Sequence, residues 1–450
     1  GVPAKPYTIQ SSGGLMGVDA VSAAPVRTCV SGPAAGVIGA SEVGRGAGFS
    51  NLITFDVGGT STDVSLTLKG KPQLTSRRMV AGYPVRTPMI DITVIGAGGG
   101  SIATVDEAGA LKVGPRSAGA DPGPAAYGKG GANATITDAN LCLGRLDPSA
   151  LLGGGMPIDL AAARTAVKCC VAEPLGLSLE DAAHGILRIA NANMSRAIRS
   201  VSVERGHDLK DFALCAYGGA GPLHAAEVAD ECGLSTVLVP QEPGTLCARG
   251  MLLTDVTTDL VRSTFCDADE ATFCEILTAL GELVADGDAW LDNHGVPAGD
   301  RRFETTVDAR HQGQNFEISV GCDDLNEEGF AGFLSRFHAA HRREYGYALE
   351  GRAVEFVNAR VRATGLIPRL EMAGLSREGS LQEARVGTRC LYLDGSAGFV
   401  DAPVYRRDSL PPGEPFEGPA IIEEMSATTL VLAGQTAELD LFGNLIMTLT

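Results

Sequence analysis

The sequence predicts a mixed α/β core followed by a β-rich α+β domain, and three observations lead to that prediction. The apolar run at 52–55 ends in a Gly-Gly-Thr turn, after which alternating apolar residues resume at once, as in a β-hairpin. The run at 212–217 is followed by a glycine turn and a helix-like segment at 223–232, which is the order of elements in an α/β fold. Residues 353–450 are mostly short alternating segments between turns, which indicates β-rich structure.

The chain has 450 residues, enough for several domains that each bury a core. Its composition changes near 255–262, so we expect a domain boundary there. The predicted domains are an α/β core at 1–258 and an α+β to β-rich domain at 259–450. Hydrophobic residues make up 44% and charged residues 20%, which is ordinary for a globular protein.

The net charge of −18 argues against binding to a nucleic-acid backbone. No apolar run is long enough to span a membrane and no secretory signal is apparent, so we expect neither membrane insertion nor export. The eleven cysteines are scattered without a CxxC pair, which is typical of reduced thiols and not of a structural zinc site. The expected location is therefore cytoplasmic.

The first candidate site is the turn DVGGTSTD at 56–63. Its adjacent glycines, Gly58 and Gly59, let the backbone approach an anion and direct N–H groups towards it. Hydroxyl donors follow at Thr60, Ser61 and Thr62. A tight hairpin with solvated hydroxyls is the structural alternative, but the whole pattern between two strands is more specific for phosphate than a lone GGT.

Two carboxylates flank this turn, Asp56 before it and Asp63 after it. They would repel a bare phosphate, but they suit Mg²⁺ or its bound waters. An acidic protein that binds a polyanion needs such a cation, or backbone N–H groups, to do so.

The second candidate site is the glycine turn before the helix at 223–232. Its residues are Gly218, Gly219, Ala220, Gly221 and Pro222. A strand, a glycine turn and a helix N-terminus together form a nucleotide-contact geometry. They are also the commonest connection in any α/β fold, so this turn is weak evidence by itself.

Residues 95–101 read IGAGGGS, which is similar to a dinucleotide fingerprint. Ser101 stands where the third glycine belongs, and the residues after it predict a hairpin instead of the required helix. We therefore do not expect a Rossmann site, and a glycine-lined wall near a ligand is the remaining functional interpretation. The Gly- and Pro-rich segment 114–156 is expected to be an ordered loop packed beside a site.

Two segments rich in small residues, 31–40 and 244–253, predict helices that neighbours can approach closely. Ser31 is the expected N-cap of the first, and Gly32, Gly36 and Ala40 share one face of it.

Polar residues also occur within two amphipathic segments. Asn191 and Asn193 lie in a predicted helix at 178–203, where paired core amides are favoured over pocket-facing ones. His338 and His341 lie three residues apart in a predicted helix at 327–345, and without acidic or Cys partners a packed histidine is favoured over a metal ligand.

The order of these parts resembles the second half of an actin–hexokinase-type ATPase fold. The resemblance makes 31–40 and 244–253 the connecting helices, 56–63 the second phosphate loop and 218–222 the adenosine loop. A first phosphate hairpin precedes these parts in that superfamily, and no second DxGGT occurs here. The resemblance therefore leads us to expect that an N-terminal portion of the ATPase core is missing.

More specifically, the chain resembles the hydantoinase A / 5-oxoprolinase family. The matching phrases are SGPAAGVIGA (31–40), FDVGGTSTDVSL (55–66), IGAGGGSIATVD (95–106), VGPRSAGADPGPAAYGKGG (113–131), TITDANLCLGRL (135–146), NANMSRAIRSVSVERGHD (191–208), AYGGAGPLHA (216–225) and YGYALEGRAVEFVNARVRA (345–363). The resemblance implies ATP-dependent hydrolysis of a cyclic amide such as a hydantoin, 5-oxoproline or a lactam, through a phosphorylated intermediate. It also implies ATP and Mg²⁺ as cofactors, and a hydantoinase B-type partner in a hetero-oligomer.

The same resemblance implies roles for the two turns. Gly58, Gly59 and Thr60 would hold the β- and γ-phosphates, with hydroxyl bonds from Ser61 and Thr62. Asp56 and Asp63 would be the catalytic carboxylates, Asp56 being the expected Mg²⁺ ligand. The adenosine would lie against Gly218, Gly219, Ala220 and Gly221. Two alternatives stay open: a subunit of an ATP-dependent ketone carboxylase, and a non-catalytic ATP-binding subunit.

Overall fold

A computed structural model describes residues 6–75, 78–80, 82–322, 329–368, 374–375 and 379–449. The chain forms two compact units, which are described separately below. Unit 1 comprises Gly1–Thr8, Gly14–Pro25 and Thr254–Arg369, and unit 2 comprises Ile9–Gly13, Val26–Leu253 and Leu370–Thr450. These units do not coincide with the expected domains 1–258 and 259–450, because the last part of the chain groups with the core and not with 254–369.

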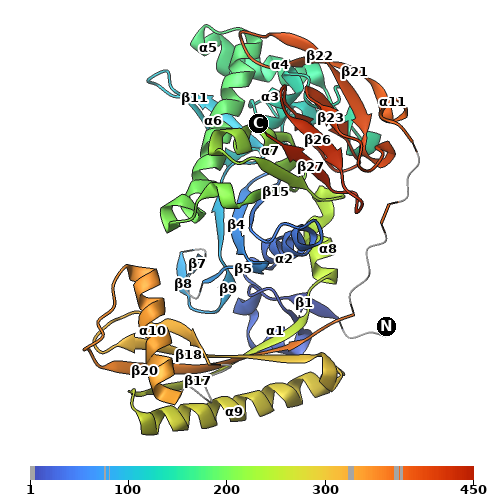
Figure 1. The fold of residues 1–450 in the computed structure, drawn as a ribbon. Helices are drawn as coiled ribbons and strands as arrows, with labels where there is room; N and C mark the ends of the chain where they lie inside the picture. Colours follow the sequence, from blue (N-terminus) through green and yellow to red (C-terminus); the bar gives the residue numbers. More distant parts are fainter. Residues whose placement is uncertain are drawn as a thin grey trace. The chain divides into compact units, whose positions relative to one another are not determined.

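Unit 2 is built on a nine-stranded sheet with the order β10-β4-β3-β15-β16-β27-β26-β23, in which β5 also pairs with β4 (Figure 1). Its strands are β3 (Leu52–Val57), β4 (Thr62–Leu68), β5 (Lys71–Pro72), β10 (Ile92–Ile95), β15 (Ala213–Tyr217), β16 (Thr236–Val239), β23 (Phe416–Glu417), β26 (Thr436–Leu439) and β27 (Leu445–Thr448). The hairpin predicted from 52–68 is confirmed as β3 and β4. Strand β27 pairs with β16, which explains why the end of the chain belongs to this unit.

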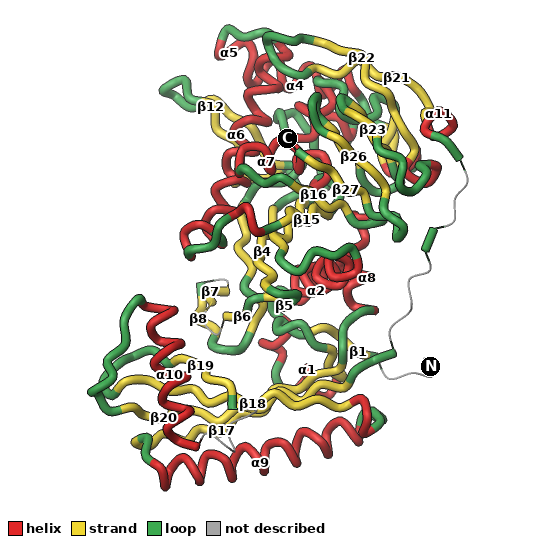
Figure 2. Tube along the Cα trace, viewed as in Figure 1, coloured by secondary structure: helices red, strands yellow, loops and turns green. Residues whose placement is uncertain are grey.

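Smaller sheets complete unit 2, as Figure 2 shows in yellow. They contain β6 (Leu74–Thr75) with β9 (Met89–Ile90), β7 (Arg78–Val80) with β8 (Tyr83–Val85), β11 (Ser101–Val105) with β12 (Leu111–Ser117), β13 (Ala150–Leu151) with β14 (Met156–Pro157), and the four-stranded β21 (Arg385–Tyr392), β22 (Phe399–Arg406), β24 (Ala420–Glu423) and β25 (Thr428–Val431). The pair β11–β12 confirms that a hairpin, and not a helix, follows the IGAGGGS segment.

Unit 2 also contains helices. They are α2 (Ser31–Gly46), α3 (Ile136–Cys142), α4 (Leu160–Val167), α5 (Glu173–Leu175), α6 (Leu179–Val201), α7 (Gly221–Cys232), α8 (Leu246–Leu252) and α11 (Leu381–Ala384). The predicted N-cap at Ser31 is wrong, since Ser31 is already the first helical residue. Val30 occupies the cap position in the left-handed conformation, with φ of 58° and no side-chain cap.

The two predicted small-residue helices, α2 and α8, lie side by side (Figure 1). A Cβ atom on Gly39 would come within 3.1 Å of the Gly250 Cα atom, and one on Gly250 would overlap the carbonyl of Ala35. Glycine is therefore required at this contact. The predicted face is only partly correct, because a Cβ on Gly32 would meet nothing.

Unit 1 contains the strand order β2-β17-β20-β18-β19, with β1 (Tyr7–Ile9) beyond β2, together with α-helices. Its elements are β2 (Leu15–Gly17), α1 (Val18–Ala23), β17 (Val256–Asp267), α9 (Glu270–Asn293), β18 (Arg301–His311), β19 (Ile318–Gly321), α10 (Gly329–Tyr345) and β20 (Val354–Gly365). Apolar side chains of α9 and α10, among them Phe273 and Phe333, form one core with Phe356 of β20. The predicted start of the second helix, Glu327, lies outside the described residues.

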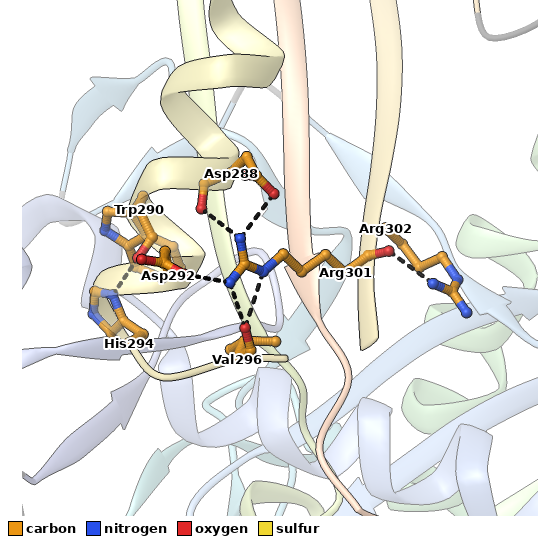
Figure 3. Close-up of polar contacts among 7 residues, drawn as sticks. All are labelled: Asp288, Trp290, Asp292, His294, Val296, Arg301 and Arg302. Carbon is orange, nitrogen blue, oxygen red and sulfur yellow. Dashed lines mark hydrogen bonds and ion pairs between the residues drawn. The ribbon is translucent and has the colours of Figure 1, made fainter. Parts of the chain in front are cut away.

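Arg301 joins the end of α9 to the start of β18 (Figure 3). Its guanidinium donates to the carboxylates of Asp288 at 2.9 Å and Asp292 at 2.7 Å, and to the carbonyl of Val296 at 2.7 and 2.9 Å. One side chain thus closes the connection between a helix and the next strand.

His341 of α10 is buried, and its Nδ1 lies 2.7 Å from the Tyr347 carbonyl. The rings of His311 and His341 are 4.8 Å apart, in an edge-on arrangement. Across the part of the chain that the structure describes, no helix is long and apolar enough to cross a membrane.

Candidate functional site

The register of the central sheet brings the two predicted glycine turns together. Strands β3 and β15 are parallel, with Asp56 opposite Tyr217, so both strands end at the same edge. The amide of Ala220 donates to the carbonyl of Val57 at 3.0 Å. Gly218 has a φ of 80°, and a Cβ atom on it would overlap the carboxylate of Asp56. Two segments about 160 residues apart in the sequence therefore form one surface.

The glycines of the IGAGGGS segment support the tip of the β3–β4 hairpin. The amide of Gly99 donates to the carbonyl of Gly58 at 3.0 Å, and that of Gly100 to the carbonyl of Gly59 at 2.6 Å. Because C=O and N–H point in opposite directions across a trans peptide, the N–H groups of Gly59 and Thr60 face away from this support. The hairpin thus presents two backbone donors on the side opposite its own hydrogen bonds.

A cavity of about 810 Å³ lies against both turns. Four of the predicted site residues line it: Gly58, Gly59, Gly219 and Ala220. The predicted wall and loop contribute the other side, including Gly99, Tyr127 and residues of 146–156. The segment predicted as an ordered loop, 114–156, is ordered and lines the cavity in part, but it also contains α3 and the short strands β13 and β14.

The remaining predicted site residues do not line the cavity: Asp56, Thr60, Ser61, Thr62, Asp63, Gly218 and Gly221. Thr62 is fully buried and its hydroxyl donates to the Ala97 carbonyl, so it is not available to a ligand without breaking that bond. Gly59 and Thr60 are exposed at the hairpin tip.

The two carboxylates of the hairpin, Asp56 and Asp63, face each other across the strands. Burial raises the pKa of Asp56, although its hydrogen bond from the Cys247 thiol at 3.3 Å opposes the effect. Burial and then the charge of Asp56 raise the pKa of Asp63 to about 6, against the guanidinium of Arg78. Burial disfavours the ionisation of both carboxyl groups, and the charge of Asp56 further disfavours that of Asp63. A cation here would favour the ionised forms.

The surroundings of Asp63 fit a Mg²⁺ ion or its bound waters. The Asp63 Oδ1 atom is buried and has no partner among the described residues, as expected of a site for a cation or its waters. No group of three His, Cys, Asp or Glu side chains in the described ranges could hold a metal ion. These residues therefore fit an ion that takes most ligands from phosphate and water, as Mg²⁺ commonly does.

A buried network of side-chain hydrogen bonds lies beside the cavity, and it was not predicted from the sequence. The guanidinium of Arg145 makes two hydrogen bonds to the carboxylate of Glu227, at 2.6 and 2.8 Å. Asn191 donates to the same carboxylate at 2.7 Å, and its Oδ1 lies 2.8 Å from Nδ1 of His224. Asn191 is thus buried and paired, as predicted for a core amide, but it also lines a second cavity of about 1000 Å³. His224 itself lines the cavity.

The surroundings of Glu227 and His224 determine their protonation states. Burial alone would raise the pKa of Glu227, but the charge of Arg145 and its hydrogen bonds outweigh burial and lower that pKa to about 2. Burial lowers the pKa of His224 to about 4, so its ring is neutral at pH 7. One signal in the sequence could have identified His224, namely its position in the first turn of the helix after the second glycine turn.

Residues near the end of the chain also line the cavity, and sequence reasoning placed them in a separate domain. They are Arg406, Asp408, Glu423, Glu424, Met425, Ser426, Ala427 and Thr428. Arg407 holds this region to the core sheet, because its guanidinium donates to Glu424 at 2.6 Å and to the Val239 carbonyl at 2.7 Å. The cavity is therefore closed by the segment after β22, all within unit 2.

Comparison with known proteins places the chain in a family. The family model described as Hydantoinase/oxoprolinase matches residues 1–260, and that of the Hydantoinase/oxoprolinase C-terminal domain matches residues 271–447. The caprolactamase alpha subunit of Pseudomonas jessenii is 37% identical over 438 residues, covering 96% of this chain and 63% of that subunit. The 5-oxoprolinase of Saccharomyces cerevisiae is 32% identical over 456 residues, covering 95% of this chain and 34% of that enzyme. The chain thus spans less than two thirds of either relative.

Solved structures share the mixed α/β fold. The crystal structure of the ATP-dependent caprolactamase from Pseudomonas jessenii gives a TM-score of 0.86 at 35% identity, over 99% of this chain and 65% of that one. A nucleotide-free structure of acetone carboxylase, which carboxylates acetone with ATP, gives a TM-score of 0.82 at 28% identity, over 99% and 64%. With both family models matching and these likenesses extending over nearly its whole length, the chain belongs to the hydantoinase/oxoprolinase family.

Proposed function

We propose that the 810 Å³ cavity of unit 2 is the ATP site of an ATP-dependent enzyme. The observation that carries the proposal is the meeting of two glycine turns at one sheet edge, with Gly58 and Gly59 on one side of the cavity and Gly219 and Ala220 on the other. The outward N–H groups of Gly59 and Thr60 suit phosphate oxygens. In this proposal unit 2 corresponds to the second half of an actin–hexokinase-type ATPase fold.

Asp56 and Asp63 are the proposed catalytic carboxylates, with Asp56 as the Mg²⁺ ligand. Bound Mg²⁺ would supply charge neutralisation for the phosphates. The hairpin itself would orient the terminal phosphate, through the N–H groups of Gly59 and Thr60 and the hydroxyls of Thr60 and Ser61. The second turn, with Gly218 and Gly221 behind its lining residues, would pass close to the adenosine.

The proposed reaction is hydrolysis of a cyclic amide of the hydantoin, 5-oxoproline or lactam type. An amide carbon resists attack by water because its nitrogen is a poor leaving group. Transfer of the terminal phosphoryl group from ATP to the amide oxygen releases ADP and makes that carbon electrophilic. Water then adds to that carbon, and the ring C–N bond breaks to leave an amine and an acyl phosphate. A second water hydrolyses the acyl phosphate to a carboxylate and free phosphate. The 37% identity to a caprolactamase subunit supports this assignment.

A subunit of an ATP-dependent ketone carboxylase is the second candidate. It is supported by the likeness to acetone carboxylase, with a TM-score of 0.82. The same phosphoryl chemistry would there activate an enolate oxygen or bicarbonate. In either case we propose a hydantoinase B-type partner in a hetero-oligomer, because the caprolactamase relative is itself described as one subunit.

ADP release by the intact natural protein, purified with the subunits that accompany it, separates the two candidates. The substrates to offer are hydantoin, 5-oxoproline, caprolactam and acetophenone, each with and without bicarbonate. Release driven by a ring amide without bicarbonate supports the hydrolase. Release that requires a ketone together with bicarbonate replaces it with the carboxylase. Tight ATP binding without release under any condition points to a non-catalytic ATP-binding subunit.

The variant Asp56→Asn tests the site independently of the substrate. It keeps the size of the side chain and removes its charge, so ATP turnover should fall by at least about a hundredfold, on the scale of lost electrostatic catalysis. Circular dichroism and the unfolding temperature should show an intact fold. Turnover close to that of the wild type in a folded Asp56→Asn protein would contradict the assignment.

A further inference from the structure

Two residues that line the proposed ATP cavity each carry a buried hydrogen-bond acceptor with no partner in the part of the chain that the structure describes. Nε2 of His224 and Oδ1 of Asn140 are unpaired among the described residues, and the two side chains are 0% and 1% exposed. Both residues belong to the lining of the 810 Å³ cavity. Buried polar atoms are nearly always paired, so two orphans in one cavity indicate a missing ligand.

The hydrogen bonds around His224 fix the role of its outer nitrogen. The Glu227 carboxylate can only accept, so the group of Asn191 that lies 2.7 Å from it is the amide Nδ2. Oδ1 of Asn191 therefore faces Nδ1 of His224 at 2.8 Å, and Nδ1 must carry the proton. Nε2 is then an unprotonated acceptor. Its ring is held in one orientation by Asn191, which in turn is held by the ion pair between Glu227 and Arg145.

Asn140 is oriented in a similar way. Its Nδ2 donates to the carbonyl of Ile136 at 3.1 Å, one turn earlier in α3, which leaves Oδ1 as the unpaired end. The two orphans are thus both acceptors, and a ligand that satisfies them must bring N–H or O–H donors. Phosphate oxygens at pH 7 cannot do this, so these acceptors suit a different part of the ligand.

The rest of the cavity lining indicates which part that is. Apolar side chains of Leu151, Leu152, Met156 and Met425 line the same cavity, with Leu152 and Met425 exposed. Apolar surface together with convergent polar atoms suits a flat base or its sugar. Leu223, also in the lining, directly follows the second glycine turn.

We propose that His224 Nε2 and Asn140 Oδ1 accept hydrogen bonds from the nucleoside of ATP and make the site selective for it. The inference rests on the proposed ATP site and names its specificity residues. The donors are either the 6-amino group of adenine or the ribose hydroxyls. An acceptor facing the 6-amino group would disfavour 6-oxo bases, which present an oxygen at that position.

Binding measurements on the intact natural protein with its accompanying subunits test the proposal. Dissociation constants are compared for ATP, ITP, 2′-deoxy-ATP and 3′-deoxy-ATP by calorimetry. The main variant is His224→Asn, whose amide can still donate to Asn191 but lacks an acceptor at the Nε2 position. Asn140→Leu tests the second acceptor separately. His184→Asn, on α6 and outside this cavity, is the matched control.

The expected result is a loss of about five- to tenfold in ATP affinity for each test variant, as for one neutral hydrogen bond, and no loss for His184→Asn. If a test variant lowers the affinity for ATP but not for ITP, the donor is the adenine amino group. If the affinity for a deoxynucleotide does not fall, the donor is a ribose hydroxyl. An equal loss for all four nucleotides, or no loss, overturns the proposal and indicates acceptors satisfied by bound water. Failure of the wild type to bind ATP would instead contradict the proposed function, before any variant is made.

Discussion

The carboxyl group of Asp63 lies in surroundings that disfavour its ionised form. Burial and the opposing Asp56 raise its pKa from 3.8 to about 6. The folded state therefore binds this proton more tightly than the unfolded state. Stability from this group is complete below the unfolded pKa and is lost as the pH rises through about 6. A shift of this size corresponds to about 3 kcal/mol, as an order of magnitude.

The variant Asp63→Asn should therefore stabilise the protein at neutral pH, when nucleotide and Mg²⁺ are absent. The expected gain in the free energy of unfolding is about 1–3 kcal/mol at about pH 7.5 and close to zero at about pH 3.5, below the unfolded pKa. Urea unfolding at both pH values measures it, with the exposed Asp401→Asn as the control. A gain that is equal at both values would show that the charge of Asp63 is not its source. In the proposed site the same variant should lose ATP turnover, so stability and activity should change in opposite directions.

At the scale of single residues, the sequence predicted the glycines of the candidate site but not its unpaired hydrogen-bond acceptors. Gly58 and Gly219 were predictable because a turn between a strand and the next element is a local pattern. His224 and Asn140 were not, because their significance lies in having no partner after folding. Glu227 and Arg145 pair across 82 residues, which no local spacing indicates.

The contact between α2 and α8 depends on the absence of side chains. The substitution Gly250→Ala would drive a methyl group into the carbonyl of Ala35 and to 3.0 Å from the amide of Gly39, so the helices must separate. We expect a loss of about 1–3 kcal/mol in the free energy of unfolding, typical of an overpacked contact, measured by urea denaturation.

Gly32→Ala in the same α2 helix is the matched control for that substitution. Nothing lies within 4 Å of a Cβ atom at Gly32, and alanine favours a helix by up to about 1 kcal/mol over glycine. The control should be neutral or slightly stabilising. Equal effects of Gly250→Ala and Gly32→Ala would mean that the interhelical contact does not hold the helices at this distance.

Arg301 is the corresponding contact in unit 1, between α9 and β18 (Figure 3). Arg301→Gln removes the charge that faces Asp288 and Asp292 and most of the donors to Val296. The unfolding temperature should fall by several degrees. Arg302→Gln should change it less, because the partners of Arg302 among the described residues are the carbonyls of Gly299 and Arg301. The reverse order in a thermal scan would show that the helix end does not need this cation.

At the scale of elements, the two hairpins were predicted correctly from local sequence patterns, whereas the first residue of helix α2 was not. The β3–β4 hairpin and the β11–β12 hairpin follow from alternation and turn residues. The N-cap at Ser31 did not follow, because Val30 takes a left-handed conformation and lets the helix begin at Ser31 without a side-chain cap. Residues with φ above zero are rarely Val, so sequence preference gave no warning.

At the scale of the whole molecule, the division into units departs from the sequence order. The composition changes near 255–262, and the two family models divide between 260 and 271, close to the predicted boundary. The two compact units do not follow this boundary. Strand β27 pairs with β16, and Arg407 donates to Glu424 and to the Val239 carbonyl, so the end of the chain belongs to the core unit. Strand pairing between segments about 200 residues apart depends on the final sheet order, which hydrophobic periodicity does not encode.

A chain that ends at residue 369 should therefore not keep the core of unit 2. It would lose β23, β26 and β27, and so expose the edge of β16, where Val237 pairs with Met447. It would also lose the cavity residues at 423–428. We expect aggregation and no nucleotide binding from residues 1–369 made alone.

Making 370–450 as a separate chain in the same cells should restore solubility and nucleotide binding, since the missing strand edge and cavity wall are then supplied in trans. Soluble yield and ATP binding of the two preparations measure this. A soluble, ATP-binding protein of residues 1–369 would show that the core closes without its last strands, and that the boundary near 258 separates independent domains.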